Sequence, residues 1–123
     1  MSVNESDGMA AGETAIMETI REQIESNPII LYMKGDPNQP QCGFSASSVQ
    51  ALVACGERFA YVDILSNPDI RANLPKYANW PTFPQLWING ELMGGCDIIT
   101  EMAKTGELKK LITEAAPDAS SEE

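Results

Sequence analysis

The chain has 123 residues, of which 43% are hydrophobic, and this is enough for one compact domain with its own core. Eighteen acidic residues against eight basic ones give a net charge of −10, and no cluster of Lys or Arg is present to neutralise the phosphates of a nucleic acid. No apolar run approaches the ~20 residues of a membrane span, and the acidic start resembles neither a secretory signal nor a transit peptide. We therefore expect a cytosolic protein that binds neither nucleic acid nor membrane.

The cysteines and the absence of histidine narrow the chemistry further. Three widely spaced cysteines, Cys42, Cys55 and Cys96, do not form the pattern of a disulfide framework. A chain without histidine has no Ser-His-Asp or Cys-His catalytic pair, no histidine zinc site and no Rieske-type cluster ligation. The cysteines are therefore expected to be catalytic, metal-ligating or buried.

The start of the chain predicts a tail, a helix, a strand and a loop. Residues 1–13 are small and polar without periodicity, and they are expected to be a disordered tail. Residues 14–26 place isoleucines on one face of an amphipathic helix that ends before Pro28. The apolar run 29–33 predicts a strand that is buried on both faces, and the glycine and prolines of 34–41 predict a loop.

The middle of the chain predicts a second helix and a second strand. The helix runs from about Cys42 to Cys55, and Gly56 stands at the usual stop position. Its expected inner face consists of Val49, Leu52 and Val53. Cys55 would lie roughly 20 Å along the helix axis from Cys42, too far to share a metal within one subunit, and is expected in the core. Residues 59–64 predict the next strand.

A third helix and a hairpin follow. Asn67-Pro68 predicts a cap and a proline at the first position of a helix that continues to Tyr77. Residues 85–88 predict a strand, and Asn89-Gly90 is typical of the two-residue turn of a hairpin, whose second strand would be 91–93.

The end of the chain predicts two more helices, at about 97–104 and 107–115, which are separated by Gly106, and an acidic disordered tail at 117–123. Residues 14–116 are then the folded domain. Parallel crossovers through helices and one antiparallel hairpin predict a mixed four-stranded sheet that is flanked by helices. This is the thioredoxin-like arrangement of the α/β class, with an extra N-terminal helix.

Cys42 is the strongest candidate for a reactive group. It opens the sequence Cys42-Gly43-Phe44-Ser45 at a predicted helix start, where free N–H groups and the helix dipole stabilise a thiolate, and Lys34 adds positive charge. A lone cysteine is more often a small buried hydrophobe, but this placement favours the reactive role. Ser45 stands where a CxxC pair would have its second cysteine. An oxidised Cys42 must therefore pair with an outside thiol, ligate metal or reach another cysteine.

Two further motifs lie beside predicted strands. In Trp80-Pro81-Thr82-Phe83-Pro84-Gln85-Leu86, a cis bond before Pro84 would leave the backbone of Phe83 free to pair with an extended peptide, although an ordinary loop is the alternative. The glycines of Gly94-Gly95-Cys96-Asp97 let a ligand approach the backbone, and the following helix start can hold a carboxylate. Asp97 is either an N-cap or an acceptor for a ligand ammonium group.

Together with Lys34-Gly35, these motifs resemble the signature of CGFS-type monothiol glutaredoxins, most closely the short single-domain bacterial form. The motifs occur in the right order, and the resemblance covers about residues 14–116. It implies that Cys42 is the active thiolate and a ligand of iron. It also implies a glutathione site that is formed by Lys34, Arg71, Thr82, Phe83, Pro84, Gly95, Cys96 and Asp97.

The resemblance gives each part of that site a role. Lys34 and Arg71 would hold the glycine carboxylate of glutathione, and Phe83 would pair through its backbone with the cysteinyl residue. Cys96 and Asp97 would bind the γ-glutamyl end. Family members also form dimers around a 2Fe–2S cluster and pair with BolA-type proteins.

Three functions are compatible with these features. A 2Fe–2S centre needs four ligands, which Cys42 from two chains and two glutathione thiolates would supply. We favour this glutathione-bridged homodimer. It would act as a cluster carrier for iron–sulfur acceptor proteins and in iron homeostasis, rather than as an efficient enzyme. The alternative is a glutathione-dependent thiol–disulfide oxidoreductase that uses Cys42 alone. The third is an interaction module that binds a BolA-like protein without chemistry.

Overall fold

The computed structural model describes the backbone of residues 7–116 and the side chains of residues 14–116. Four strands of the described chain form one mixed sheet in the order β4-β1-β5-β6. These strands are β1 (Ile29–Met33), β4 (Ala60–Asp63), β5 (Gln85–Ile88) and β6 (Glu91–Gly94). A short separate hairpin, β2 (Gly35–Asp36) and β3 (Gln39–Pro40), lies within the predicted loop 34–41.

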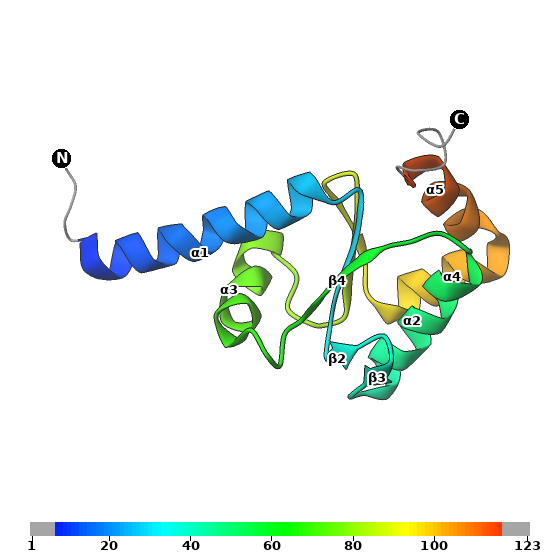
Figure 1. Cartoon of the computed structure of the whole chain (residues 1–123), viewed down its shortest axis with the longest axis horizontal. Coiled ribbons are helices and arrows are strands. Elements are labelled where there is room, and N and C mark those ends of the chain that lie inside the picture. Colours follow the sequence, from blue (N-terminus) through cyan, green and yellow to red (C-terminus); the bar gives the residue numbers. More distant parts are fainter. Residues whose placement is uncertain (1–6, 117–123) are drawn as a thin grey trace.

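Helices cover both faces of the sheet, as Figure 1 shows. They are α1 (Asp7–Ser26), α2 (Gly43–Ala54), α3 (Pro68–Ala78), α4 (Cys96–Thr105) and α5 (Glu107–Ala115). Helices α1 and α3 pack together on one side, and α2, α4 and α5 pack together on the other (Figure 1). The predicted thioredoxin-like fold, with its additional N-terminal helix, is therefore confirmed.

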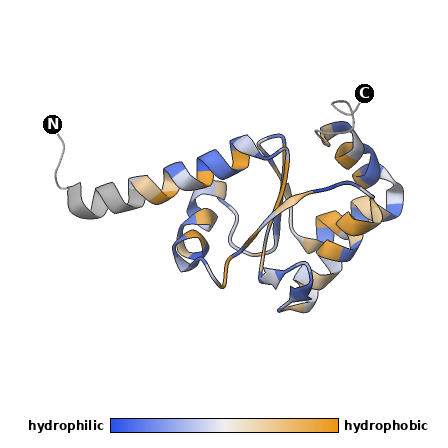
Figure 2. Ribbon diagram, viewed as in Figure 1, coloured by the Kyte–Doolittle hydropathy of each residue, from blue (hydrophilic) through white to orange (hydrophobic). Residues whose placement is uncertain are grey.

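Strand β1 divides the hydrophobic core into two halves. Because successive side chains of a strand point to opposite faces, Leu31 and Met33 contact the α2, α4 and α5 side, whereas Ile30 and Tyr32 contact the α1 and α3 side. All five residues of β1 are buried, as the uninterrupted apolar run predicted. Figure 2 shows hydrophobic residues along the central strands and on α2, whereas hydrophilic and hydrophobic residues alternate along the coloured part of α1.

The sheet contains two antiparallel pairs rather than the one that was predicted. Strands β1 and β4, which are connected through α2, are parallel. Strand β5 follows α3, but it is antiparallel to β1. The segment that follows α3 returns the chain to the end of the sheet at which β1 ends, so that Gln85 lies opposite Tyr32. The β5–β6 hairpin is as predicted, and its turn residues Asn89 and Gly90 have φ angles of 51° and 83°.

The start of α1 and the inner face of α2 differ from the prediction. Helix α1 begins at Asp7, so residues 7–13, expected in the disordered tail, are helical; Met9, Ala10 and Ala11 are good helix formers. The remaining tail predictions, for 1–6 and 117–123, lie outside the described residues.

The inner face of α2 is also different, because the side chain of Val53 is 60% exposed. Ser45 and Ser48 are buried on that face together with Val49 and Leu52. The hydroxyl of Ser48 donates a hydrogen bond to the carbonyl of Phe44 over 2.9 Å, and this bond lets a polar side chain occupy a core-facing position.

Candidate functional site

Cys42 is the N-cap residue of α2. Its backbone is extended, with φ −155° and ψ 156°, and its Sγ accepts a hydrogen bond from the N–H of Ser45 over 3.3 Å. The hydroxyl oxygen of Ser45 lies 3.5 Å from the same sulfur. An N-cap side chain satisfies N–H groups that the first turn of a helix leaves without partners, so the sulfur takes the place of an ordinary capping oxygen.

The surroundings of Cys42 favour the thiolate. Partial burial alone would raise the pKa of the Cys42 thiol. Hydrogen bonds from the hydroxyl and N–H of Ser45 and from the N–H of Phe44, together with the charge of Lys34, outweigh burial and hold this pKa below its ordinary value. A larger fraction of the sulfur is therefore ionised at neutral pH, which makes it a better nucleophile and a better metal ligand.

Ser45 connects Cys42 to the loop that carries Lys34. Its side chain is fully buried, and its Oγ accepts a hydrogen bond from the backbone N–H of Lys34 over 3.1 Å. The hydroxyl hydrogen is then available to donate to the ionised Cys42 sulfur, which carries no hydrogen of its own. A resolving cysteine at this position is replaced by a residue that stabilises the thiolate.

A pocket of about 700 Å³ lies between α2, α3, α4 and the loop before β5. It is lined by all of the residues predicted to bind glutathione: Lys34, Arg71, Thr82, Phe83, Pro84, Gly95, Cys96 and Asp97. The other lining residues are Phe44, Pro75, Trp80, Pro81 and Ile98. Cys42 itself is not a lining residue, but Phe44, two residues further along α2, is. The structure thus brings together residues from five separate segments, and their role in binding stays a prediction.

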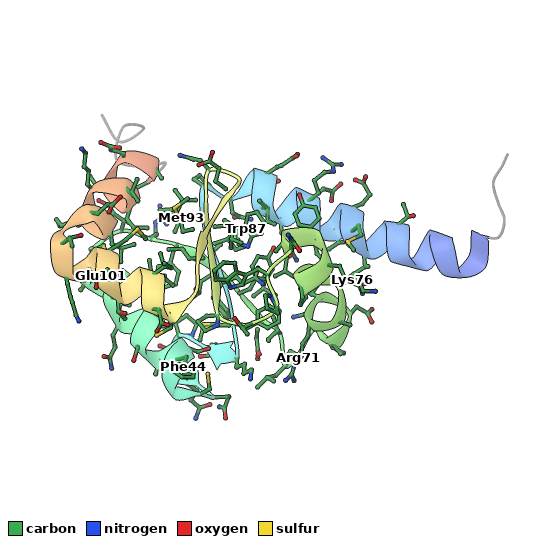
Figure 3. The ribbon with its side chains drawn as sticks, turned by 180° about the vertical axis from the view of Figure 1, so that it is seen from behind. Phe44, Arg71, Lys76, Trp87, Met93 and Glu101 are labelled. Carbon is green, nitrogen blue, oxygen red and sulfur yellow. The ribbon has the colours of Figure 1, made fainter. Side chains whose placement is uncertain are left out.

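The charges of the pocket are divided among three side chains. Lys34 and Arg71 are its cationic lining residues, and Asp97 is its anionic one. Figure 3 shows Arg71 on α3 and Phe44 on α2 toward the same end of the molecule. A ligand that carries both carboxylate and ammonium groups is therefore complementary to this pocket in charge.

The backbone beside the pocket has unused hydrogen-bonding groups. The Phe83–Pro84 peptide bond is cis, the isomer that the sequence left undecided. Within residues 7–116, neither the N–H nor the C=O of Phe83 has a hydrogen-bond partner. An extended ligand backbone would satisfy both groups.

Two glycines of the motifs differ in whether the fold requires them. Gly94 has φ +141°, and a Cβ there would lie 2.7 Å from the Cγ1 atom of Ile98, so the fold requires a glycine. Gly43 has no positive φ, and a Cβ at this position would meet nothing within 4 Å. The space at Gly43, next to Cys42, is therefore open, and the backbone conformation does not require a glycine there.

Asp97 is not the N-cap of α4. The N-cap residue is Gly95, which has no side chain to cap the helix, and Asp97 lies exposed within the first turn. Of the two roles considered for Asp97, the N-cap is therefore excluded, because α4 already begins at Cys96. Asp97 remains available as an acceptor at the edge of the pocket, and its negative charge is favourable near a helix N-terminus.

Sequence reasoning missed that two residues beside the pocket, Trp80 and Gln85, have buried polar groups. The indole Nε1 of Trp80 is buried without a hydrogen-bond partner among the described residues. Gln85 is fully buried at the first position of β5. A polar residue at the start of an otherwise apolar strand was the available signal for Gln85.

Cys55 is the C-cap residue of α2 and is buried, as predicted. Its thiol donates to the carbonyl of Ala51 over 3.4 Å. Burial raises the pKa of the Cys55 thiol; the nearby charge of Lys109 lowers it and that of Glu57 raises it. No group of three or more Cys, Asp or Glu side chains within the described part of the chain has the arrangement of a metal site. Among the helices described, none is long and apolar enough to span a membrane.

Comparison with known proteins identifies the family. Residues 29–93 match the pattern of the family described as Glutaredoxin. The chain is 70% identical to Glutaredoxin 4 of Escherichia coli (strain K12) over 107 residues, which cover 87% of this chain and 93% of that protein. It is 64% identical to Glutaredoxin 4 of Buchnera aphidicola subsp. Baizongia pistaciae (strain Bp) over 98 residues, 80% of this chain and 91% of that one.

Solved structures agree with this relationship. Reduced poplar apo GrxS14 superimposes with a TM-score of 0.70 at 44% identity and covers 81% of this chain and 92% of its own. A monomeric truncated mutant of Trypanosoma brucei 1-C-Grx1 superimposes with a TM-score of 0.72 at 35% identity and covers 80% and 89% of the two chains. With Ser45 in the position of a second active-site cysteine, the chain belongs to the glutaredoxin family as a monothiol member.

Proposed function

We propose that this monothiol glutaredoxin binds glutathione in the pocket and carries a 2Fe–2S cluster between two subunits in the cytosol. In this proposal it serves cluster assembly and iron homeostasis, and its partners are a second copy of the chain when the cluster is bound, a BolA-like protein and iron–sulfur acceptor proteins. The observation that carries the proposal is the half-buried Cys42 thiol, whose pKa is lowered, beside a pocket of about 700 Å³ with complementary charges.

Glutathione fits the chemistry of the pocket at three points. It has two carboxylates and one ammonium group, and the pocket offers Lys34 and Arg71 for the first and Asp97 for the second. The free N–H and C=O of Phe83 suit the backbone of a short peptide. Phe44, two residues after Cys42, also lines the pocket, so a peptide bound there would lie close to the start of α2.

The donor set of one chain fits a cluster that is shared rather than enclosed. Thiolates are the usual ligands of a 2Fe–2S cluster, and four are needed. Of the three cysteines, Cys42 and Cys96 are partly exposed, and Cys55 is buried at the opposite end of α2 from Cys42. Cys42, whose pKa is lowered, is the one proposed as a cluster ligand. Two Cys42 thiolates and two glutathione thiolates complete the set. Ligands that are not part of the protein exchange readily, which suits a cluster that is cargo.

Anaerobic assembly with iron and sulfide, with and without glutathione, tests this proposal. We expect colour only when glutathione is present, in a species with the mass of a dimer and about one iron per chain. Cys42→Ser should stay colourless, whereas the matched variant Cys55→Ser should become coloured. A colourless monomer under all conditions would contradict the carrier function.

The second candidate is deglutathionylation, and the lowered pKa of Cys42 favours it. The Cys42 thiolate would attack the glutathione sulfur of a mixed disulfide and release the substrate as a thiolate. A second glutathione thiolate would then attack the Cys42–glutathione disulfide, giving oxidised glutathione and the free Cys42 thiolate. Rapid turnover of a glutathionylated peptide by protein that assembles no cluster would favour this function over the first.

A further inference from the structure

Gln85 is fully buried at the start of β5, directly after Pro84, and all the hydrogen-bonding capacity of its amide nitrogen is used. The Nε2 group donates to the carbonyl of Trp80 over 3.1 Å and to the carbonyl of Thr82 over 3.2 Å. The Oε1 atom accepts from the indole Nε1 of Trp87 over 3.2 Å. One side chain therefore connects the sheet to two points of the loop that lines the pocket.

The loop between α3 and β5 has few other polar connections. The N–H groups of Asn79 and Trp80 bond back to α3, over 3.4 and 3.1 Å. From Pro81 to Pro84, the described chain makes no backbone–backbone hydrogen bond, and the two prolines have no N–H to donate. Since a loop without such bonds gains its order from other contacts, the amide of Gln85 is the main polar restraint on this segment.

We propose that Gln85 is a positioning residue, which holds the loop Trp80–Pro84 in the conformation that presents Thr82 and the backbone of Phe83 to the ligand. The proposal rests on the glutathione site proposed above and extends it to a residue that does not line the pocket. A preformed loop lowers the entropy that binding must otherwise cost, so the effect of Gln85 is on ligand affinity.

The amide is suited to this role because it supplies two donors and one acceptor at once. Methionine has a similar length and no donor, so it removes both bonds to the loop and the acceptor for Trp87. Glutamate keeps the acceptor, and in a buried position between carbonyls its carboxyl group takes up a proton and donates one bond. The two substitutions should therefore give graded effects.

The matched control is Gln23 of α1, on the other side of the sheet from α2, α4 and α5. Its Oε1 accepts a hydrogen bond from the hydroxyl of the buried Tyr32 over 2.8 Å, and it does not line the pocket. Gln23→Met thus removes a core-facing amide and costs stability, but it leaves the loop Trp80–Pro84 unchanged.

The test has two measurements on the full chain: calorimetric affinity for reduced glutathione, and NMR order parameters of the Thr82 and Phe83 N–H groups without ligand. We expect Gln85→Met to bind about tenfold more weakly, the effect of two lost hydrogen bonds, with lower order parameters at both N–H groups. Gln85→Glu should recover part of both values, and Gln23→Met should resemble the wild type. If Gln85→Met does not fold, the comparison of Gln85→Glu with Gln23→Met decides.

Equal affinities and equal order parameters in Gln85→Met and the wild type would overturn the proposal, as would an equal loss in Gln23→Met. If the wild type itself binds no glutathione, the proposed function fails. The order parameters then decide separately: a loss confined to the Gln85 variants would support the positioning role, and unchanged values would overturn it.

Discussion

The two ends of α2 each carry a cysteine, and the structure treats these two thiols in opposite ways. Cys42 at the N-terminal end accepts an N–H hydrogen bond, and its pKa is lowered. Cys55 at the C-terminal end donates its thiol hydrogen to a carbonyl, and its pKa is raised. The free groups of a helix are donors at its start and acceptors at its end. The same residue is therefore kept ready to ionise at one end and kept protonated at the other.

The largest expected effect is on alkylation of the native protein. At neutral pH, iodoacetamide should modify Cys42 at least about a hundredfold faster than Cys55, because Cys55 is protonated and its side chain is only 5% exposed. Mass spectrometry of the digested protein assigns the modified cysteines. In unfolded protein, Cys42 and Cys55 should be alkylated at similar rates. Similar rates in the native protein as well would contradict the proposed difference between the two helix ends.

A smaller effect is expected from Ser45→Ala. The loss of the hydroxyl bond should raise the pKa of Cys42 and slow its alkylation at neutral pH by about three- to tenfold. The midpoint of the pH–rate profile should move up with it. Because Ser45 also accepts the N–H of Lys34, rates are measured well below the melting temperature. Ser47→Ala, at an exposed position of the same helix, is the control and should leave the profile unchanged.

A still smaller effect is expected from Lys34→Gln. Lys34 acts on Cys42 through charge alone, so its removal should slow alkylation only about twofold. Added salt should slow the wild type and have less effect on Lys34→Gln, because salt screens the same interaction. Lys110→Gln on α5, whose side chain is exposed and outside the pocket, should respond like the wild type. An identical salt dependence in all three proteins would exclude this contribution.

The smallest effect is a difference in sign between the two cysteines in how stability depends on pH. The lowered pKa of Cys42 stabilises the fold above the unfolded-state pKa, and this contribution is lost as the pH falls through the folded-state value. The raised pKa of Cys55 stabilises the fold below the unfolded-state pKa, and this contribution is lost as the pH rises through the folded-state value.

Urea unfolding on both sides of pH 9.0, the ordinary thiol value, measures this difference. As the pH rises, the free energy of unfolding of Cys42→Ser should fall relative to the wild type, and that of Cys55→Ser should rise. If the free energies of unfolding of both variants changed with the same sign relative to the wild type, the two cysteines would not have opposite effects on how stability depends on pH.

Local patterns in the sequence predicted most of the fold. The apolar run of β1, the Asn89-Gly90 turn and the break at Gly106, whose φ is 87°, each depend on a few neighbouring residues. The direction of β5 could not be predicted in this way, because it depends on where the chain returns after α3. Val53 was predicted on the inner face of α2 because it is hydrophobic. The structure places Ser45 and Ser48 there instead, since their buried hydroxyls have hydrogen-bond partners that hydrophobicity alone does not show.

The candidate site could be predicted to a similar extent. The motifs include the start of α2 and three polar lining residues, Lys34, Thr82 and Asp97, because these lie next to glycine, proline or cysteine in the sequence. Arg71 lies in no motif, and only the resemblance to the family indicated it. Gln85 and Trp80 were missed as individual residues, since their significance lies in contacts that only the folded chain creates. Residues that line the pocket can thus be recognised from a motif more easily than residues whose hydrogen bonds connect its segments.

The open space at Gly43 has a consequence for how the chain tolerates change. Neither its φ nor its neighbours exclude a side chain, whereas at Gly94 both do. In a library of random variants that is selected only for folding, Gly94 should stay glycine and position 43 should drift to other residues. Selection for access to the Cys42 sulfur should restore glycine at position 43. The frequencies at these two positions would then separate what the fold requires from what the thiol requires.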